Sequence, residues 1–161
     1  MSLDLTRWQD PLVIQRAIHA MRTVAIVGLS SNRLRASHFV GFYLRRHGVK
    51  VIPVNPREKE VFGIASVPTL AEVTEPVDIV DVFRAPDALP AIAREAVQIG
   101  AKTLWCQYTV INEEGGLIAE RGGLSVVMDR CLKVEHARYV GRMHWLGLNT
   151  QRITSVRGGL Q

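Results

Sequence analysis

The segment VGLSSNRLRAS, at residues 27–37, has the residue types that bind phosphate groups. Gly28 allows a sharp turn and a close approach of the backbone to a ligand. Ser30, Asn32 and Ser37 supply hydroxyl and amide groups, and the first amides of a following helix would add free donors. Because only one of the three glycines of a dinucleotide-binding loop is present, an ordinary strand-to-helix connection explains the segment equally well.

A second polar group, Asn55, Pro56 and Arg57, follows the apolar run VIPV. NAD-binding domains place Asp or Glu at this point, where the carboxylate accepts hydrogen bonds from the adenosine ribose. An amide followed by a cation disfavours that ribose contact and favours an additional phosphate. CoA carries such a phosphate on the ribose 3′-oxygen and NADP carries it at the 2′ position, and these residues do not choose between the two.

The elements that must position these residues alternate along the chain as apolar strands and amphipathic helices. The strands are continuously apolar, which is typical of a parallel sheet covered on both faces. We therefore predict an α/β fold, namely a Rossmann-like, doubly wound, mainly parallel five-stranded sheet in three layers, α/β/α. The predicted strands are 23–28, 49–55, 77–83, 102–107 and 124–128, and the predicted helices are about 10–22, 37–47, 86–100, 112–122 and one from about 131.

Ligands of such sheets bind beyond the carboxyl ends of the strands, where the strand order reverses. This rule adds Phe83, Arg84 and Gln107 to the candidate residues, because they follow the third and fourth strands. Pro53 is awkward for a central strand, since it lacks a backbone donor. Residues 60–66 are predicted to be irregular, and Thr69 with Glu72 predicts a capping box over a short turn of helix.

Length and composition indicate one domain over residues 1–161, with a loose tail at about 151–161. The net charge of +5 favours an anionic partner, yet the basic residues are dispersed rather than clustered. Two cysteines are too few for a disulfide framework, and no long apolar run or secretory signal is present. We expect a cytoplasmic protein whose partner is neither a nucleic acid nor a membrane. A protein partner and a homo-oligomer both remain open.

Four further groups of residues suggest chemistry, and each has a simpler structural explanation. Cys131, near a helix start and Arg130, could be a reactive thiol that joins the thiol of CoA or accepts an acyl group, but a buried small side chain is the favoured interpretation. A metal site at Cys106, Cys131 and His136 is not expected, because no paired ligand motif is present.

Glu135 and His136 could form an acid–base pair, although a salt link on a helix surface is favoured. Asp81, one of two aspartates in an apolar strand with Asp78, is expected to accept hydrogen bonds from backbone amides, with a ligand hydroxyl as the alternative. Trp105 and Trp145 are expected to be packing residues.

Four motifs, IVGLSSN, VIPVNP, VDIVDVFR and VVMDRCLKVEH, occur in this order along the chain. Together they resemble the CoA-binding domain family of small stand-alone bacterial and archaeal proteins. That family is similar to the nucleotide-binding domain of the succinyl-CoA synthetase alpha subunit. The resemblance covers about residues 8–152, including GLNT at 147–150. One departure is Ala36, where the family often has proline before the serine that opens the second helix.

The resemblance implies a CoA- or acyl-CoA-binding protein with no catalytic residues and no metal. Its implied contacts are the pyrophosphate at Gly28, Ser30, Asn32 and Ser37, the ribose and its 3′-phosphate at Asn55, Pro56 and Arg57, the adenine side at Phe83 and Arg84, and the pantetheine arm near Gln107. The synthetases react through a phosphorylated histidine on a separate domain that these 161 residues do not supply. An NADP-dependent oxidoreductase and a basic nucleic-acid-associated regulator are the alternatives.

Overall fold

Five parallel strands form a single sheet at the centre of the protein. The structure, a computed structural model, describes residues 3–140, so Trp145, the GLNT segment and the predicted tail lie outside the described residues. The strand order is β2-β1-β5-β6-β7, and each neighbouring pair is parallel. The strands are β1 (Thr23–Val27), β2 (Lys50–Val54), β5 (Ile79–Val82), β6 (Thr103–Cys106) and β7 (Ser125–Met128).

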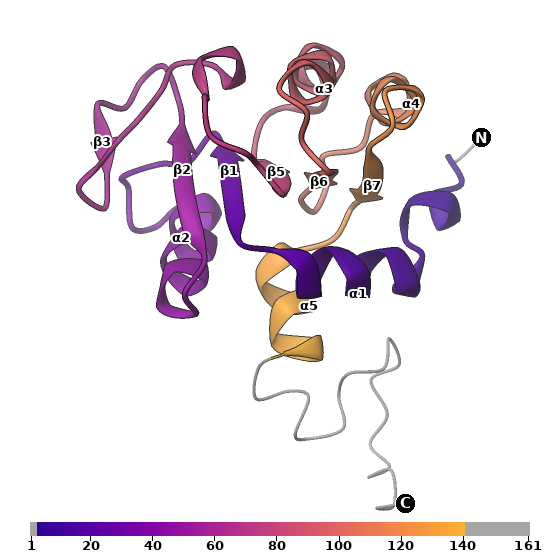
Figure 1. Cartoon of the computed structure of the whole chain (residues 1–161), viewed down its shortest axis with the longest axis horizontal. Coiled ribbons are helices and arrows are strands. Elements are labelled where there is room, and N and C mark those ends of the chain that lie inside the picture. The colour runs from indigo at the N-terminus through magenta and orange to yellow at the C-terminus, as the bar shows by residue number, and fades with distance from the viewer. Residues whose placement is uncertain (1–2, 141–161) are drawn as a thin grey trace, which may run out of the picture.

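Helices cover both faces of this sheet (Figure 1). One face packs on α3 (Leu89–Gln98) and α4 (Glu113–Arg121), and the other packs on α1 (Pro11–Ala20), α2 (Ala36–Arg46) and α5 (Leu132–Tyr139). Successive residues of a strand point to opposite faces, so both must be apolar to be buried. The continuous apolar strands reflect this arrangement, and the predicted three-layer α/β/α fold is confirmed. Within residues 3–140, no helix is both long and apolar enough to cross a membrane.

Two helices begin at residues whose side chains cap them. Asp10 accepts a hydrogen bond from Leu12 N at 2.9 Å, and Asn112 accepts one from Gly115 N at 2.9 Å. Each cap satisfies a backbone donor that the first helical turn leaves without a partner. At α2, by contrast, Arg35 precedes the helix and its side chain forms no cap.

The strand order reverses between β1 and β5, since the chain runs from β1 outward to β2 and then returns to β5. The carboxyl ends of β1 and β5 therefore lie side by side at the point where α/β sheets bind ligands. The edge position of β2 also accounts for Pro53, whose missing donor is tolerated at the border of a sheet. Pro53 still contributes its carbonyl, which accepts a hydrogen bond from Val67 N at 3.0 Å.

Two local predictions after β2 are wrong. Residues 60–66 are not irregular, because β3 (Glu60–Val61) and β4 (Ile64–Ala65) form a small antiparallel hairpin. The short helix η2 (Leu70–Glu72) does form, but Thr69 makes no side-chain cap. Its backbone carbonyl instead accepts the hydrogen bond from Glu72 N at 3.2 Å, so the turn closes without a capping box.

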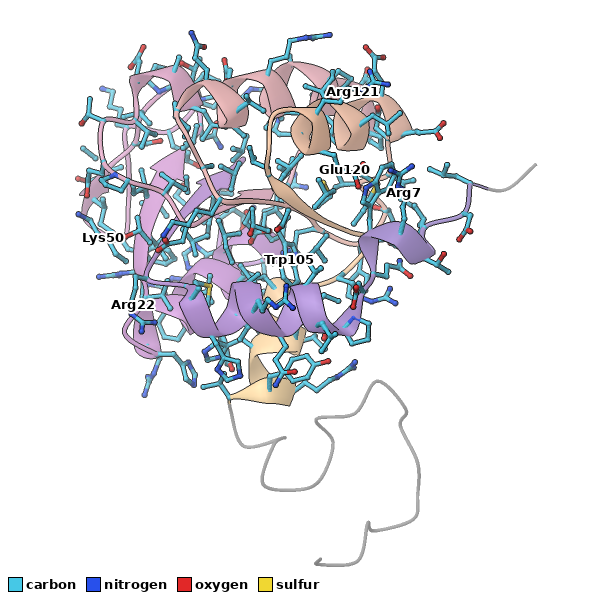
Figure 2. All side chains as sticks on the ribbon, turned by 45° about the vertical axis from the view of Figure 1, so that its right-hand side comes forward. Arg7, Arg22, Lys50, Trp105, Glu120 and Arg121 are labelled. Carbon is cyan, nitrogen blue, oxygen red and sulfur yellow. The ribbon has the colours of Figure 1, made fainter. Side chains whose placement is uncertain are left out.

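The N-terminal segment is anchored to α4 through η1 (Thr6–Trp8), which the sequence did not predict. Trp8 is buried, and its indole nitrogen donates to Glu120 at 2.7 Å. Arg7 donates to the same carboxylate, also at 2.7 Å. Figure 2 labels Arg7 and Glu120, which lie next to each other. The remaining short helix, η3 (Pro86–Ala88), leads directly into α3.

Candidate functional site

Gly28 ends β1 in a conformation that only glycine adopts readily. Its φ is +90°, and its amide donates to Val54 O at 2.8 Å. A β-carbon at this position would lie 2.6 Å from the carbonyl oxygen of Phe83, which is backbone and has no freedom to move aside. The chain after β1 therefore lies against the chain after β5, and glycine is required for this contact.

The predicted loop residues form a connected set of hydrogen bonds. Ser37 Oγ accepts from Ser30 N at 3.1 Å, and Ser30 Oγ accepts from Asn32 N at 3.0 Å. Asn32 Oδ1 in turn accepts from Leu34 N at 3.0 Å. The structure thus brings Ser30, Asn32 and Ser37 together. Because α2 starts beside this loop without a side-chain cap, its first backbone amides are suited to bind an anion.

Glu58 is a component of the loop that the sequence analysis missed. One of its carboxylate oxygens accepts from both the amide and the hydroxyl of Ser31, each at 2.9 Å. The Glu58 carboxylate therefore accepts the hydrogen bonds of two donors that could otherwise bind a phosphate. It also adds a like charge to the site.

We expect Glu58→Gln to raise the affinity for a phosphate-bearing ligand such as CoA. Removing one negative charge a few ångströms from a bound phosphate is worth about 1 kcal/mol near water, which is about fivefold in Kd. Titration calorimetry would measure the change. The control is Glu75→Gln, because Glu75 pairs with Lys50 at the amino-terminal edge of the sheet. An equal gain in both variants would contradict a local role for Glu58.

Asn55 acts in the structure as a brace between two loops. Its amide nitrogen donates to Leu29 O at 3.0 Å, and its side-chain oxygen accepts from Arg57 N at 3.0 Å. These bonds fix the turn after β2 against the loop after β1. The Arg57 side chain is exposed at this turn. Contact of Asn55 with the ribose, rather than this bracing role, stays a prediction.

Two clefts open at the carboxyl edge of the sheet. The first, here named the Pro56 cleft, measures about 260 Å³ and is lined by residues that include Val27, Val54, Pro56, Leu70, Arg84 and Ile92. The second, named the Gln107 cleft, measures about 310 Å³ and is lined by residues that include Val40, Phe83, Arg84, Gln107, Tyr108 and Cys131. Arg84 lines both, so it marks the point where they approach each other.

The clefts lie over opposite faces of the sheet. Val27 and Leu70 of the Pro56 cleft belong to the core beneath α3, whereas Val40 of the Gln107 cleft belongs to the core beneath α2. The structure therefore places Phe83 with Gln107 and not with Pro56. Of the two residues predicted for the adenine side, only Arg84 lines the Pro56 cleft.

Asp81 lies buried beside Gln107. Its side chain is 0% exposed, and its Oδ1 lies 2.6 Å from Gln107 Nε2. Burial raises the pKa of Asp81 to about 8, and the hydrogen bond from Gln107 only partly offsets that rise. The expectation that Asp81 accepts from backbone amides is wrong. That role belongs to Asp78, which accepts from the amides of Arg22 and Thr23 at 2.9 Å each.

The start of α5 bears on two further expectations: it favours the simple packing interpretation of Cys131 and corrects the expectation for Glu135 and His136. Cys131 is half-buried against the Gln107 cleft, and this burial raises its pKa despite backbone amides that favour the thiolate. Glu135 and His136 form no surface salt link, because both are buried. Glu135 pairs with Arg138 at 3.5 Å, and His136 Nδ1 lies 2.9 Å from the hydroxyl of Tyr43.

Two other predictions concern packing and metal binding. Trp105 is buried and its indole donates to Arg130 O at 2.9 Å, which confirms its packing role. Among the residues that the structure describes, no three His, Cys, Asp or Glu side chains are grouped so as to hold a metal ion.

Comparison with known proteins identifies the family. The uncharacterized protein YneT of Bacillus subtilis (strain 168) is 38% identical over 124 residues, which is 77% of this chain and 92% of that protein. A hypothetical protein from Pyrococcus horikoshii OT3 has a solved structure that matches with a TM-score of 0.81 and 30% identity, over 88% of this chain and 99% of that one.

A larger enzyme shares the fold alone. The apo structure of a dinucleotide-forming acetyl-coenzyme A synthetase from Ca. Korarchaeum cryptofilum matches with a TM-score of 0.58 and 21% identity, over 65% of this chain and 25% of that one. The family model described as the CoA binding domain matches residues 22–137 of this chain. Because that match spans more than half of the chain, and because the chain is 38% identical to YneT, the chain belongs to the CoA-binding domain family.

Proposed function

We propose that the protein binds coenzyme A across the carboxyl edge of its sheet, with the nucleotide over one face and the pantetheine arm over the other. The observation that carries this proposal is the pair of clefts that meet at Arg84 beside the Gly28 loop. A ligand with a flat apolar end, charged phosphates in the middle and a narrow arm matches this order of surfaces.

The Pro56 cleft supports adenine binding. Its walls are mainly aliphatic and include Pro56, while Thr69 and Glu95 supply polar groups. An adenine ring buries its faces against apolar walls and satisfies its edge with a few polar groups. Arg57 follows Pro56 directly, so a ribose 3′-phosphate at the mouth of this cleft would be within reach of its guanidinium group.

The Gly28 loop supports binding of the pyrophosphate between the two clefts. The glycine at position 28 lets the loop after β1 lie directly against the backbone of Phe83 and beside the Arg84 side chain. The hydroxyl of Ser37 and the amides at the start of α2 supply donors, and Arg84 supplies a cation. Charge-assisted bonds of this type are about twice as strong as neutral ones.

The experiment that tests this proposal is calorimetric titration of nucleotide-free protein with CoA, dephospho-CoA and NADP. We expect CoA to bind most tightly and the affinity to fall without the 3′-phosphate. Preference for NADP over CoA would overturn the proposal in favour of an oxidoreductase cofactor. Binding of none of the three would also overturn it.

Arg57→Gln is expected to weaken CoA binding about tenfold, since a solvent-facing charge-assisted contact to the 3′-phosphate contributes about 1.4 kcal/mol. The same substitution should leave the affinity for dephospho-CoA unchanged, because that ligand lacks the phosphate. Arg121→Gln is the matched control, as Arg121 is exposed at the far end of α4 (Figure 2). Equal weakening of both ligands by Arg57→Gln would contradict a specific contact with the 3′-phosphate.

The proposal assigns a binding role in the cytoplasm without chemistry on the ligand. It is supported by the contacts of Glu135 and His136, the acid–base pair named in the sequence analysis, whose side chains interact with Arg138 and Tyr43. Burial of His136 also lowers its pKa to about 4, so it stays neutral at ordinary pH. Acyl-CoA incubated with the protein should remain intact, which chromatography of the thioester would show. Protein-dependent hydrolysis or acyl transfer would overturn this part of the proposal.

A further inference from the structure

Gln107 lines the cleft named after it, and its side chain is hydrogen-bonded to a buried acid, Asp81. Among the residues that the structure describes, no other polar side chain of this cleft has such a partner. Gln107 is 5% exposed and lines the cleft from the end of β6. Its side-chain amide lies 2.6 Å from Asp81 Oδ1. An amide has a donor end and an acceptor end, so the state of Asp81 decides which end faces the ligand.

Asp81 is surrounded by groups that do not stabilise a charge. Its register partners are Ile26 on β1 and Trp105 on β6, and both belong to the apolar core beneath α1, α2 and α5. Two thiols interact electrostatically with Asp81: Cys131 at the start of α5, and Cys106 on the neighbouring strand β6, whose side chain lies on the opposite face of the sheet. Within residues 3–140 no cation pairs with it.

The geometry of the Asp81 carboxyl indicates a neutral acid. Its Oδ2 is buried and has no hydrogen-bond partner. An ionised carboxylate oxygen in that state costs far more free energy than the carbonyl oxygen of a carboxylic acid. The 2.6 Å separation from Gln107 is also short for an N–H···O bond and ordinary for O–H···O.

The two ends of a side-chain amide have nearly the same shape, so Gln107 can be turned with its oxygen toward Asp81. We propose that Asp81 keeps its proton and donates it to Gln107 Oε1, so that the Gln107 amide nitrogen faces the cleft and donates to a carbonyl oxygen of the bound ligand. This inference rests on the proposed binding of CoA. The carbonyl belongs either to an amide of the pantetheine arm or to the thioester of acyl-CoA.

Asp81 is thus a positioning residue that acts through Gln107. If Asp81 loses its proton, the carboxylate attracts the amide nitrogen, and Gln107 turns its oxygen toward the ligand. Two carbonyl oxygens then face each other, which replaces a hydrogen bond by a repulsion. The contact is present while Asp81 is protonated and is lost as the pH rises past about 8.

The test compares three ligands on the full chain: a CoA thioether, acetyl-CoA, and adenosine 3′,5′-bisphosphate, which lacks the arm. The thioether avoids titration of the CoA thiol. We expect Asp81→Ala to weaken the binding of the thioether and of acetyl-CoA about tenfold relative to the binding of the bisphosphate. This change corresponds to the loss of one hydrogen bond. Loss confined to acetyl-CoA would identify the thioester oxygen as the partner. Loss for both would identify an amide oxygen.

Asp81→Asn separates positioning from packing. The asparagine amide nitrogen can donate to Gln107 Oε1 at every pH, so this variant should keep the wild-type affinity and lose its decline above about pH 8. The inference would be overturned if, in the wild type, the ratio of the dissociation constants of the thioether and the bisphosphate did not change with pH. Failure of Asp81→Asn to bind while folded, as judged by thermal unfolding, would overturn it too.

Carbon-13 NMR of the aspartate carboxyls provides a readout that needs no ligand. The Asp81 signal, assigned by its absence in Asp81→Asn, should report a protonated carboxyl at pH 6.5. An ionised carboxyl there would overturn the inference while leaving CoA binding intact. Failure of every ligand to bind, with a protonated Asp81, would instead overturn the proposed function.

Discussion

Gly28→Ala is expected to lower the free energy of unfolding by about 3 kcal/mol and to abolish tight CoA binding. Two effects add. A φ of +90° is unfavourable for any residue with a side chain, and the new β-carbon would lie 2.6 Å from the Phe83 carbonyl oxygen. Relief requires the chains after β1 and β5 to separate, which widens the junction between the two clefts. Urea unfolding and titration calorimetry would measure both losses.

Gly48→Ala is the matched control for this prediction. Gly48 also has a positive φ, +79°, but nothing lies within 4 Å of the added β-carbon. Its cost is therefore the conformational strain alone, about 1–2 kcal/mol, and CoA affinity should be unchanged. If the two alanine variants lose equal stability and both bind CoA, the contact between Gly28 and Phe83 has no role in the site.

Asp81→Asn is expected to stabilise the protein increasingly as the pH rises from about 4 to about 8. In the unfolded chain Asp81 has its usual pKa of 3.8 and is ionised over this range, whereas in the folded protein it keeps its proton. Folding therefore takes up a proton, and the wild type loses about 1.4 kcal/mol of stability per pH unit from this residue. The loss is complete above the folded pKa. Asparagine has no proton to take up.

His136 affects the same curve in the opposite direction. Burial lowers its pKa to about 4 from 6.5, so its contribution to stability is present above pH 6.5 and is lost as the pH falls toward 4. Between about pH 4 and 6.5 the contributions of Asp81 and His136 offset each other, so the free energy of unfolding of the wild type should change little. Between about pH 6.5 and 8 only the loss from Asp81 remains, and the free energy of unfolding should decline. Subtracting the two urea-unfolding curves, variant minus wild type, isolates Asp81. A difference that stays constant between pH 4 and 8 would show that Asp81 ionises normally.

The sheet and its helices could be predicted because their signals are local. Each strand carries a continuous apolar run, and Asp10 and Asn112 cap helices by bonding to amides two or three residues ahead. The ligand-binding edge follows from parallel topology, so Gly28 and Gln107 could be chosen from their places at strand ends.

The hairpin of β3 and β4 could not be predicted because its turn lacks the usual residues. Both turn positions have positive φ, 56° at Phe62 and 74° at Gly63, where Asn-Gly is the common choice. Phenylalanine is tolerated there through tertiary contacts. Its ring lies 4.7 Å from that of His38 and 5.1 Å beneath the Arg45 guanidinium.

The residues that set the charge of the site were also beyond local signals. Glu58 contacts Ser31 across 27 positions, and Asp81 contacts Gln107 across 26. Both contacts depend on which loops the sheet order brings together. The backbone amides expected for Asp81 bond to Asp78 instead, because the free amides are those of Arg22 and Thr23 at the start of β1, whereas Asp81 lies within β5, where the amides are paired in the sheet.

The division of the site between two faces of one sheet has a consequence for ligand fragments. If CoA binds as proposed, each cleft, of about 260 and 310 Å³, would accommodate only part of so long a molecule. Once one half is bound, the covalent link holds the other half near its cleft at an effective concentration in the millimolar range. Two fragments that bind weakly alone would then yield a tight complex when joined. The protein would then bind whole CoA more tightly than its breakdown products, because only the whole molecule is long enough to reach both clefts.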